Sequence, residues 1–308
     1  MKILILTSTP ASYSIKRLIE EGKKRKHEVI TENPVDLMAF ISSTTRGHDM
    51  VFKKSDPENE VKRVLAKSCD VIIPRFGGAN IFEFGTSVIE HMCGNMGIPS
   101  TSWSFGLRIA SNKFLSAQAF SQSKVRTTKS IFAFKPQDFG WIVEKLGGFP
   151  IVAKTLAGSQ GQGVFILNDA LSASTTLGAF SKLGVSLLLQ EFIDSGKPAS
   201  DIRAYVVDEK VVAAYKRFAL DEDFRSNFSI SKMGEKTTLT EEQELLAVNA
   251  ARAVCLDGVC AVDMIVCNKT QKTYVIEANG NGSLKGIEKI TRKNVAGAII
   301  EYAERIGK

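Results

Sequence analysis

Ala261-Val-Asp-Met-Ile-Val-Cys267 and Thr273-Tyr-Val-Ile-Glu-Ala-Asn279 are the two most informative segments of this 308-residue chain. Each is a short, mostly apolar run, and the five residues between them are polar, which predicts two antiparallel strands joined by a hairpin. With the loop centred on Thr270, the predicted register pairs Cys267 with Thr273, Ile265 with Val275, and Asp263 with Glu277. The last pair places two carboxylates opposite each other, with Cβ atoms roughly 5 Å apart.

The opposed carboxylates predict a metal site. Directly opposed like charges destabilise a hairpin unless a cation lies between them. Asn279 lies two residues beyond Glu277 and therefore on the same face, which adds an amide oxygen to Asp263 and Glu277. Three hard oxygen ligands are typical of magnesium, which keeps open positions for water and substrate phosphates. The alternative, a solvated face of an edge hairpin, is disfavoured because neighbours such as Val262 and Val275 are apolar.

A glycine-rich connection at residues 155–163 indicates where a phosphate chain would lie. Pro150-Ile-Val-Ala-Lys154 and Val164-Phe-Ile-Leu167 are predicted strands, and the loop between them contains three glycines. Glycine lets backbone N–H groups approach phosphate oxygens, and Lys154 supplies a positive charge at the end of the first strand. The alternative is an ordinary turn, since the loop matches neither the P-loop nor the dinucleotide-binding fingerprint.

The order of these features along the chain points to one protein family. A lysine strand, a glycine loop, an apolar strand ending at Ile193 and a carboxylate pair with an asparagine follow each other as in ATP-grasp enzymes. The chain resembles the RimK-type ATP-grasp ligases over nearly all of its length. The segments that carry the resemblance are Ser111-Asn-Lys113, Val152-Ala-Lys154, Gly158-Ser-Gln-Gly-Gln-Gly163, Gln190-Glu-Phe-Ile193, Asp201-Ile-Arg203, Val211-Val-Ala-Ala214, Asp223-Phe-Arg-Ser-Asn227, Val262-Asp263, Glu277-Ala-Asn279 and Gly286-Ile-Glu-Lys289.

The resemblance implies the ATP-grasp fold, which combines α/β and α+β architecture. It implies an N-terminal Rossmann-like (pre-ATP-grasp) domain at residues 1–105, a central ATP-grasp lobe at 106–190 and a C-terminal lobe with the magnesium site at 191–308. The two lobes would enclose ATP. Because the first predicted strand is followed by Thr7-Ser-Thr-Pro-Ala11 without GxGxxG, no nucleotide is assigned to the N-terminal domain.

Strands and helices alternate in the N-terminal domain, which favours a parallel sheet covered by helices. The predicted strands there are 2–6, 28–31 and 70–74, and the predicted helices are 14–26, 58–67 and 82–96. Further helices are predicted at 111–122, 136–146, 170–183 and 240–255. Thr240 and Gln243 at the start of the last helix fit a capping box.

For activity, the resemblance implies an ATP-dependent carboxylate–amine ligase. Such enzymes transfer phosphate from ATP to a carboxylate, and an amine then attacks the acyl phosphate to form an amide. The implied partners are L-glutamate and the C-terminal acceptor of a protein or peptide. The implied cofactors are ATP and two Mg²⁺ ions, which Mn²⁺ can replace. The alternatives are a ligase for a small-molecule or other amino-acid acceptor, and a non-catalytic nucleotide-binding module that regulates a partner.

The resemblance also assigns roles to individual residues. Lys113 and Lys154 would neutralise the α- and β-phosphates, Glu191 and Phe192 would contact the adenine edge, and Asp201 would meet the ribose hydroxyls. The other nucleotide-binding positions are Gly158, Ser159, Gln160, Gly161, Gly163, Arg225, Ser226 and Asn227, and the metal ligands are Asp263, Glu277 and Asn279.

Three arginines are predicted to act in catalysis: Arg203, Arg217 and Arg225. A guanidinium offers a fixed two-pronged geometry to carboxylate or phosphoryl oxygens, which suits an enzyme that aligns an acceptor carboxylate with a γ-phosphate. Arg203 has the alternative role of a structural ion-pair partner. Gly280-Asn-Gly-Ser283 and Lys216-Arg217-Phe218 depart from the RimK pattern, which puts the acceptor in doubt more than the ligase chemistry.

Composition narrows the class of protein further. With no run of 18 apolar residues and no signal peptide, we expect a soluble, cytoplasmic protein without a membrane partner. Five cysteines without CxxC spacing indicate free thiols. The net charge of +7 favours an anionic partner. Nucleic acid is disfavoured because the basic runs lack interleaved aromatic residues. A homo-oligomer stays open.

Overall fold

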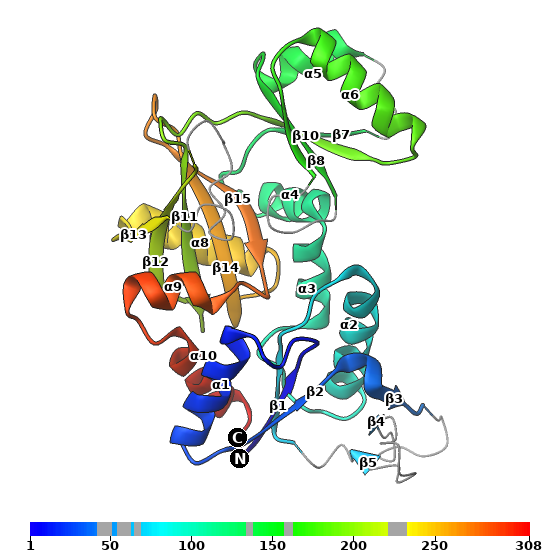
Figure 1. Ribbon diagram of the computed structural model, residues 1–308, viewed down its shortest axis with the longest axis vertical. Coiled ribbons are helices and arrows are strands. Elements are labelled where there is room, and N and C mark those ends of the chain that lie inside the picture. The colour runs from blue at the N-terminus through cyan, green and yellow to red at the C-terminus, as the bar shows by residue number, and fades with distance from the viewer. Residues whose placement is uncertain (42–50, 54–62, 65–68, 134–137, 157–162, 221–232) are drawn as a thin grey trace.

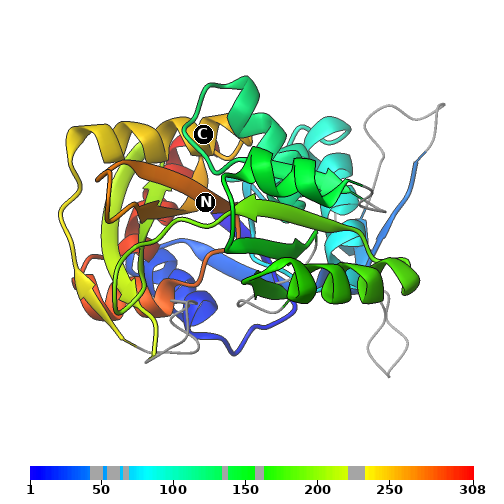
Figure 2. The same cartoon turned by 90° about the horizontal axis from the view of Figure 1, so that it is seen from above.

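The computed structural model describes residues 1–41, 51–53, 63–64, 69–133, 138–156, 163–220 and 233–308. These residues form an N-terminal domain with a parallel sheet, a small lobe with an antiparallel sheet, and a large antiparallel sheet (Figure 1). The small lobe and the large sheet lie side by side above the N-terminal domain, and they stay side by side in the view from above (Figure 2).

The N-terminal domain contains the predicted parallel sheet. Its strands, in the order β2-β1-β6, are β1 (Lys2–Leu6), β2 (Glu28–Glu32) and β6 (Val71–Pro74), and its helices are α1 (Tyr13–Lys24) and α2 (Ala79–Gly94). Side chains alternate along β1, so Ile3 and Ile5 share a core with α1 while Leu4 and Leu6 share one with α2. Leu6 lies beside Pro74, so the carboxyl ends of β1 and β6 meet at one edge.

A second, smaller sheet extends from this domain and corrects one prediction. It follows the short helix η1 (Pro34–Asp36) and contains β3 (Leu37–Ala39), β4 (Val51–Lys53) and β5 (Arg63–Val64). The helix predicted at 58–67 is wrong where the structure describes it, because Arg63–Val64 pair with β4 and this pairing overrides the local helical pattern. The rest of that predicted helix lies outside the described residues.

The small lobe is a four-stranded antiparallel sheet covered by two helices on one face. Its strands, in the order β7-β10-β8-β9, are β7 (Ser130–Ala133), β8 (Ile151–Thr155), β9 (Val164–Leu167) and β10 (Leu187–Glu191), and its helices are α5 (Phe139–Leu146) and α6 (Ala170–Lys182). Leu187 and Leu189 pack with both helices. Leu188 and its cross-strand partner Lys154 therefore face the other way, which leaves Lys154 on the uncovered face.

The large sheet has helices on both faces. Its strands, in the order β13-β12-β11-β14-β15, are β11 (Ser200–Val207), β12 (Lys210–Phe218), β13 (Gly234–Lys236), β14 (Val259–Val266) and β15 (Thr273–Asn279). One face packs with α3 (Ser104–Ser111), α4 (Lys113–Gln122) and α8 (Glu241–Ala253), and the other with α9 (Leu284–Thr291) and α10 (Val295–Ile306). Thr240 and Gln243 form the predicted capping box of α8.

The register of β14 and β15 agrees with the prediction only at its functional end. Asp263 pairs with Glu277 as predicted. The predicted pairs Ile265–Val275 and Cys267–Thr273 are wrong: the observed pairs are Met264–Val275, Ile265–Tyr274 and Val266–Thr273. Ile276 is an additional residue between the pairs of Asp263 and Met264, which is a β-bulge. The bulge shifts the register by one residue.

The last helix of the chain returns to the first. Ile299 and Ile300 of α10 share a hydrophobic core with Ile3 and Ile15 of the N-terminal domain and with Tyr205 of the large sheet. Figure 1 shows the two chain ends next to each other at the base of the molecule. The predicted division at residues 105 and 190 stays a prediction, and the C-terminal part contributes to the core of the N-terminal domain. No helix in the described ranges is both long and apolar enough to cross a membrane.

Candidate functional site

The predicted metal ligands lie together on β14 and β15. Asp263 and Glu277 are cross-strand partners, and Asn279 follows Glu277 on the same face. Asp263 is buried, with 2% exposure, whereas Glu277 and Asn279 are half-buried. The side-chain oxygen of Asn279 accepts a hydrogen bond from the backbone N–H of Asn281 at 2.8 Å.

Two arginines from the neighbouring strands hold Asp263. Arg203 on β11 is its cross-strand partner and donates from Nε to Oδ1 at 2.7 Å and from Nη2 to Oδ2 at 2.6 Å. Arg217 on β12 reaches Oδ2 of Asp263 at 2.9 Å. Arg217 also donates to Asp201, its own cross-strand partner, from Nε to Oδ1 at 2.6 Å and from Nη2 to Oδ2.

These four side chains form a buried cluster with two positive and two negative charges. Burial alone would raise the pKa of Asp263, but Arg203 and Arg217 outweigh it and lower that pKa to about 2. Asp263 is therefore ionised at neutral pH. The contacts of Arg203 are those of the ion-pair alternative, and the catalytic roles of Arg203 and Arg217 and the ribose contact of Asp201 stay predictions.

The surroundings of the Glu277 carboxylate indicate whether this site suits a cation. Its carboxylate accepts no hydrogen bond and forms no ion pair with the residues that the structure describes, although it lies opposite the ionised Asp263. In the same residues, no group of three or more His, Cys, Asp and Glu side chains is arranged as a metal site. Two carboxylates and the Asn279 amide suit a hard cation that keeps water and phosphate ligands, as Mg²⁺ does.

The two predicted phosphate lysines approach this site from the small lobe and from α4. The pKa of Lys154 is lowered to about 8, mainly by burial. Nearby Lys113 lowers this pKa further, whereas nearby Glu277 acts in the opposite direction. Lys113 is the first residue of α4, and its backbone N–H donates to the carbonyl of Leu156 just after β8. The structure thus places both Lys113 and Glu277 within electrostatic reach of Lys154.

The glycine loop is described only at its end. Gly158, Ser159, Gln160 and Gly161 lie outside the described residues, as do Arg225, Ser226 and Asn227. Gly163 has a φ of 72°, and its carbonyl accepts the backbone N–H of Thr155 at 2.9 Å. A Cβ at Gly163 would lie 2.3 Å from Oγ1 of Thr155, so this position requires glycine.

The hinge between the lobes contains two connections that are hydrogen-bonded to each other. The side chain of Gln190 donates to the hydroxyls of Thr128 and Ser130, both at 2.8 Å. The carboxylate of Glu191 accepts the backbone N–H of Lys129 at 2.8 Å. Phe192, predicted with Glu191 to contact adenine, follows directly along the chain. Sequence analysis did not identify the role of Gln190, since it depends on which strand becomes the neighbour of β10.

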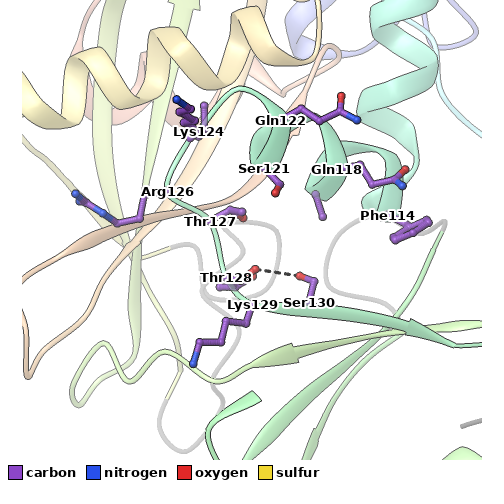
Figure 3. Close-up of a pocket in the computed structure, with 12 residues that line it drawn as sticks. Phe114, Gln118, Ser121, Gln122, Lys124, Arg126, Thr127, Thr128, Lys129 and Ser130 are labelled. Atoms are coloured by element: carbon purple, nitrogen blue, oxygen red, sulfur yellow. Dashed lines mark hydrogen bonds between the residues drawn. The ribbon is translucent and has the colours of Figure 1, made fainter. Parts of the chain in front are cut away.

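A pocket of about 600 Å³ lies beside this hinge (Figure 3). It is lined by α4 and the segment that follows it, from Phe114 to Ser130. In Figure 3, Gln118, Ser121 and Gln122 of α4 lie on one side and Thr127, Thr128 and Lys129 on the other. None of the predicted site residues lines this pocket, so it belongs to the hinge and not to the predicted phosphate or metal site.

One buried arginine that sequence analysis missed lies where the N-terminal domain meets the large sheet. Arg75 directly follows β6, is 3% exposed, and donates to the carbonyl of Gly282 at 2.6 Å and to the hydroxyl of Tyr205 at 3.2 Å. Its signal in the sequence is an arginine between the apolar strand Val71–Pro74 and a glycine pair. A charged residue directly after a buried parallel strand lies at the edge where such sheets bind ligands.

Comparison with known protein families matches nearly the whole length of the chain. Residues 110–303 match the RimK-like ATP-grasp domain, and residues 1–107 match the RimK PreATP-grasp domain. A probable alpha-L-glutamate ligase from Legionella pneumophila (strain Corby) is 35% identical over 308 residues, which cover 100% of this chain and 97% of that protein. A probable alpha-L-glutamate ligase from Picosynechococcus sp. is 35% identical over 305 residues, covering 99% and 96%.

Solved structures give the same fold at lower sequence identity. The ATP-grasp ligase PsnB complexed with a minimal precursor superposes with a TM-score of 0.74 at 14% identity, covering 100% of this chain and 99% of that chain. D-alanine–D-alanine ligase from Bacillus anthracis complexed with ATP superposes with a TM-score of 0.65 at 19% identity, covering 100% and 97%. At these identities the likeness establishes the fold alone.

Proposed function

Because the chain belongs to the RimK family of ATP-grasp ligases, we propose that it joins L-glutamate to the C-terminal carboxylate of a protein or peptide. The ATP-grasp fold and the ATP-dependent ligase class, both predicted from the sequence, are confirmed by the two domain matches and the curated relatives. The glutamate substrate is supported by the names of relatives that are 35% identical over the full chain.

The observation that carries the proposal is the acid pair. Asp263 is ionised and held by two arginines. Glu277 lies opposite it within electrostatic reach of Lys154, but forms no hydrogen bond or ion pair with the described residues. Asp263, Glu277 and Asn279 would hold Mg²⁺, which would neutralise the phosphate oxygens of ATP while phosphate is transferred. We further propose that a second Mg²⁺ ion binds with ATP and that Mn²⁺ can replace Mg²⁺.

The reaction proceeds in two steps. An oxygen of the acceptor carboxylate attacks the γ-phosphorus of ATP, and the bond to the β-phosphate oxygen breaks to release ADP. The amine of glutamate then attacks the acyl carbon, loses a proton and expels inorganic phosphate as the amide forms. Lys154 and Lys113 would neutralise the α- and β-phosphates during the first step. This chemistry needs positioning and charge rather than an enzyme nucleophile.

Glutamate selection would depend on positive charge around the site. Two carboxylates distinguish free glutamate from neutral amino acids, and a guanidinium binds a carboxylate through two parallel hydrogen bonds. Replacing the side-chain carboxylate by an amide leaves a partly desolvated guanidinium without its partner. That loss costs roughly 2 kcal/mol, or about thirtyfold in apparent specificity.

The test measures ADP release by the purified chain with ATP, Mg²⁺ and a synthetic peptide ending in glutamate. Glutamate should stimulate ADP release about thirtyfold more than glutamine, and mass spectrometry should show the peptide extended by glutamate residues. Glu277→Gln is the matched inactive control. Equal ADP release with glutamate, glutamine and alanine would contradict the proposal, as would a strict requirement for a basic amino acid.

A further inference from the structure

Arg75 carries a buried charge that no acidic side chain of the described residues neutralises. Its guanidinium is 3% exposed and contacts a carbonyl and a hydroxyl, but no acidic side chain of the described residues forms an ion pair with it. Its Nε has no hydrogen-bond partner in the part of the chain that the structure describes. A buried charge without a counter-charge is costly, so an anion bound nearby would be strongly favoured.

The N-terminus of α2 follows Arg75 closely along the chain. Its N-cap is Gly78, with a φ of 94° and no side chain to cap the first backbone N–H groups of this 16-residue helix. Gly77 and Gly78 are exposed, and a Cβ at Gly78 would find no atom within 4 Å. Free N–H groups and the helix dipole favour an anion at such an end. The glycines let it approach the backbone.

Asn281 connects this end of α2 to the predicted metal ligands. Its side-chain amide donates to the carbonyl of Phe76 at 3.0 Å, and its backbone N–H donates to the side chain of Asn279 at 2.8 Å. A Cβ at Gly77 would lie 3.7 Å from the Asn281 amide nitrogen. One residue therefore contacts both the loop before α2 and a predicted magnesium ligand, so an anion at α2 would lie next to the reaction site.

We propose that Arg75 and the N-terminus of α2 bind a substrate carboxylate beside the acid pair. This inference rests on the proposed function, since a ligase of this kind needs two carboxylate-bearing substrates next to ATP. The carboxylate belongs either to the free amino acid that supplies the amine or to the C-terminus of the acceptor. The shared chemistry is a carboxylate recognised by a buried guanidinium and by the N–H groups of a helix.

The test uses the full chain with ADP and Mg²⁺ and measures binding of two probes by calorimetry. The probes are L-glutamate and a synthetic peptide ending in two glutamates. Arg75→Met should weaken binding of one probe at least tenfold, Arg75→Lys should retain part of the affinity, and ADP affinity should stay within twofold. The probe whose binding is weakened identifies the source of the carboxylate. The amidated form of that probe should bind the wild-type chain as weakly as the unmodified probe binds Arg75→Met.

Two further variants separate binding from folding and from net charge. Gly77→Leu keeps Arg75 but fills the space before α2, and it should weaken the same probe. Arg252→Met removes one charge from an exposed surface pair with Glu209 and should bind both probes as wild type does. If Arg75→Met does not fold, Gly77→Leu alone decides. Unchanged binding of both probes in Arg75→Met or Gly77→Leu would overturn the site.

Failure of the proposed function would be seen separately. If wild type releases ADP with another amino acid and not with glutamate, the assignment of glutamate is wrong, whereas the carboxylate site remains testable with that amino acid. Weakened binding of it in Gly77→Leu would then support the site, and unchanged binding would overturn it.

Discussion

Arg217 and Arg75 are both almost fully buried, with 1% and 3% exposure, but their surroundings differ in charge. Arg217 lies between Asp201 and Asp263, which neutralise it within the large sheet. Among the described residues, Arg75 donates to a carbonyl and a hydroxyl and to no acid. A buried guanidinium between acids completes the folded structure, whereas one without an acid gains most from a negatively charged ligand. Arg217 is therefore neutralised within the fold, whereas the proposed partner of Arg75 is a substrate carboxylate.

The largest expected effects come from substitutions in the acid pair, Asp263 and Glu277. They distinguish a charge that the fold neutralises from one that serves the ligand. Glu277→Gln and Asp263→Asn should both abolish ligation, because each removes a negative charge from the predicted magnesium ligands. Only Asp263→Asn should also lower the unfolding temperature, since it leaves Arg203 and Arg217 without a shared counter-charge. ADP release and thermal unfolding of both variants measure the two effects. Wild-type turnover by Glu277→Gln would show that the pair is not the metal site.

The second test compares the two arginines directly by chemical denaturation. Arg217→Met leaves the buried carboxylate of Asp201 without its partner and Asp263 with Arg203 alone, and should lower the free energy of unfolding by about 3–5 kcal/mol. Arg75→Met removes two hydrogen bonds but leaves no acidic side chain of the described residues without a partner. We therefore expect the free energy of unfolding to fall by about 1–2 kcal/mol. Equal losses for the two variants would show that the local charge balance does not distinguish them.

The third test uses pH and concerns Lys154. Its pKa is lowered by burial to about 8 from an ordinary value near 10.5. Between these values the folded chain has released a proton that the unfolded chain still holds, so this group makes the free energy of unfolding rise with pH. ATP affinity should fall over the same range because the cation is lost, by about tenfold for each unit of pH well above the pKa.

Lys154→Met is the matched variant for the pH test. It keeps the length and apolar stem of the side chain, so ATP should bind more weakly than to wild type at pH 7 and with a flatter dependence between pH 7 and 9.5. Calorimetric titration of ATP at each pH measures both. An affinity at pH 7 equal to that of wild type would remove Lys154 from the phosphate site.

The smallest expected effect is at Tyr205, which shares an acceptor with Arg75. Its hydroxyl donates to the carbonyl of Gly282 at 2.9 Å. In Tyr205→Phe, Arg75 still donates to the carbonyl of Gly282, so the free energy of unfolding should fall by only about 0.5–1.5 kcal/mol. Substrate binding should stay within twofold of wild type. A tenfold loss of glutamate or peptide binding would show that the hydroxyl, and not the charge, recognises the substrate.

Local sequence patterns predicted those parts of the fold that local interactions decide. The capping box at Thr240 and the pairing of Asp263 with Glu277 across a hairpin are examples. The pairing was predicted in spite of a wrong register near the turn, because the bulge at Ile276 compensates for a loop whose length was misjudged. The alternation of strands and helices also predicted that the N-terminal sheet is parallel, but not the order of its strands. A bulge like the one at Ile276 leaves no distinct signal in the sequence.

Contacts between distant segments were not predictable in the same way. Arg203 meets Asp263 because β11 and β14 become neighbours, and Arg75 meets Gly282 because the N-terminal domain packs against the large sheet. Each pair is separated by 60 residues or more. No local pattern states which strand will lie next to which, so the sequence identified the charged residues but not their partners.

The packing of α10 against α1 has a consequence for the evolution of this protein. Arg75, Asp263 and Glu277 all belong to the body that α1 and α10 pack together, whereas Lys154 belongs to the small lobe. If the small lobe rotated about the hinge at Gln190, distances to Lys154 would therefore change, but those among the other three would not. Under the proposed function, a substitution beside Arg75 would change the recognition of a substrate carboxylate and leave the contacts of Lys154 unaltered.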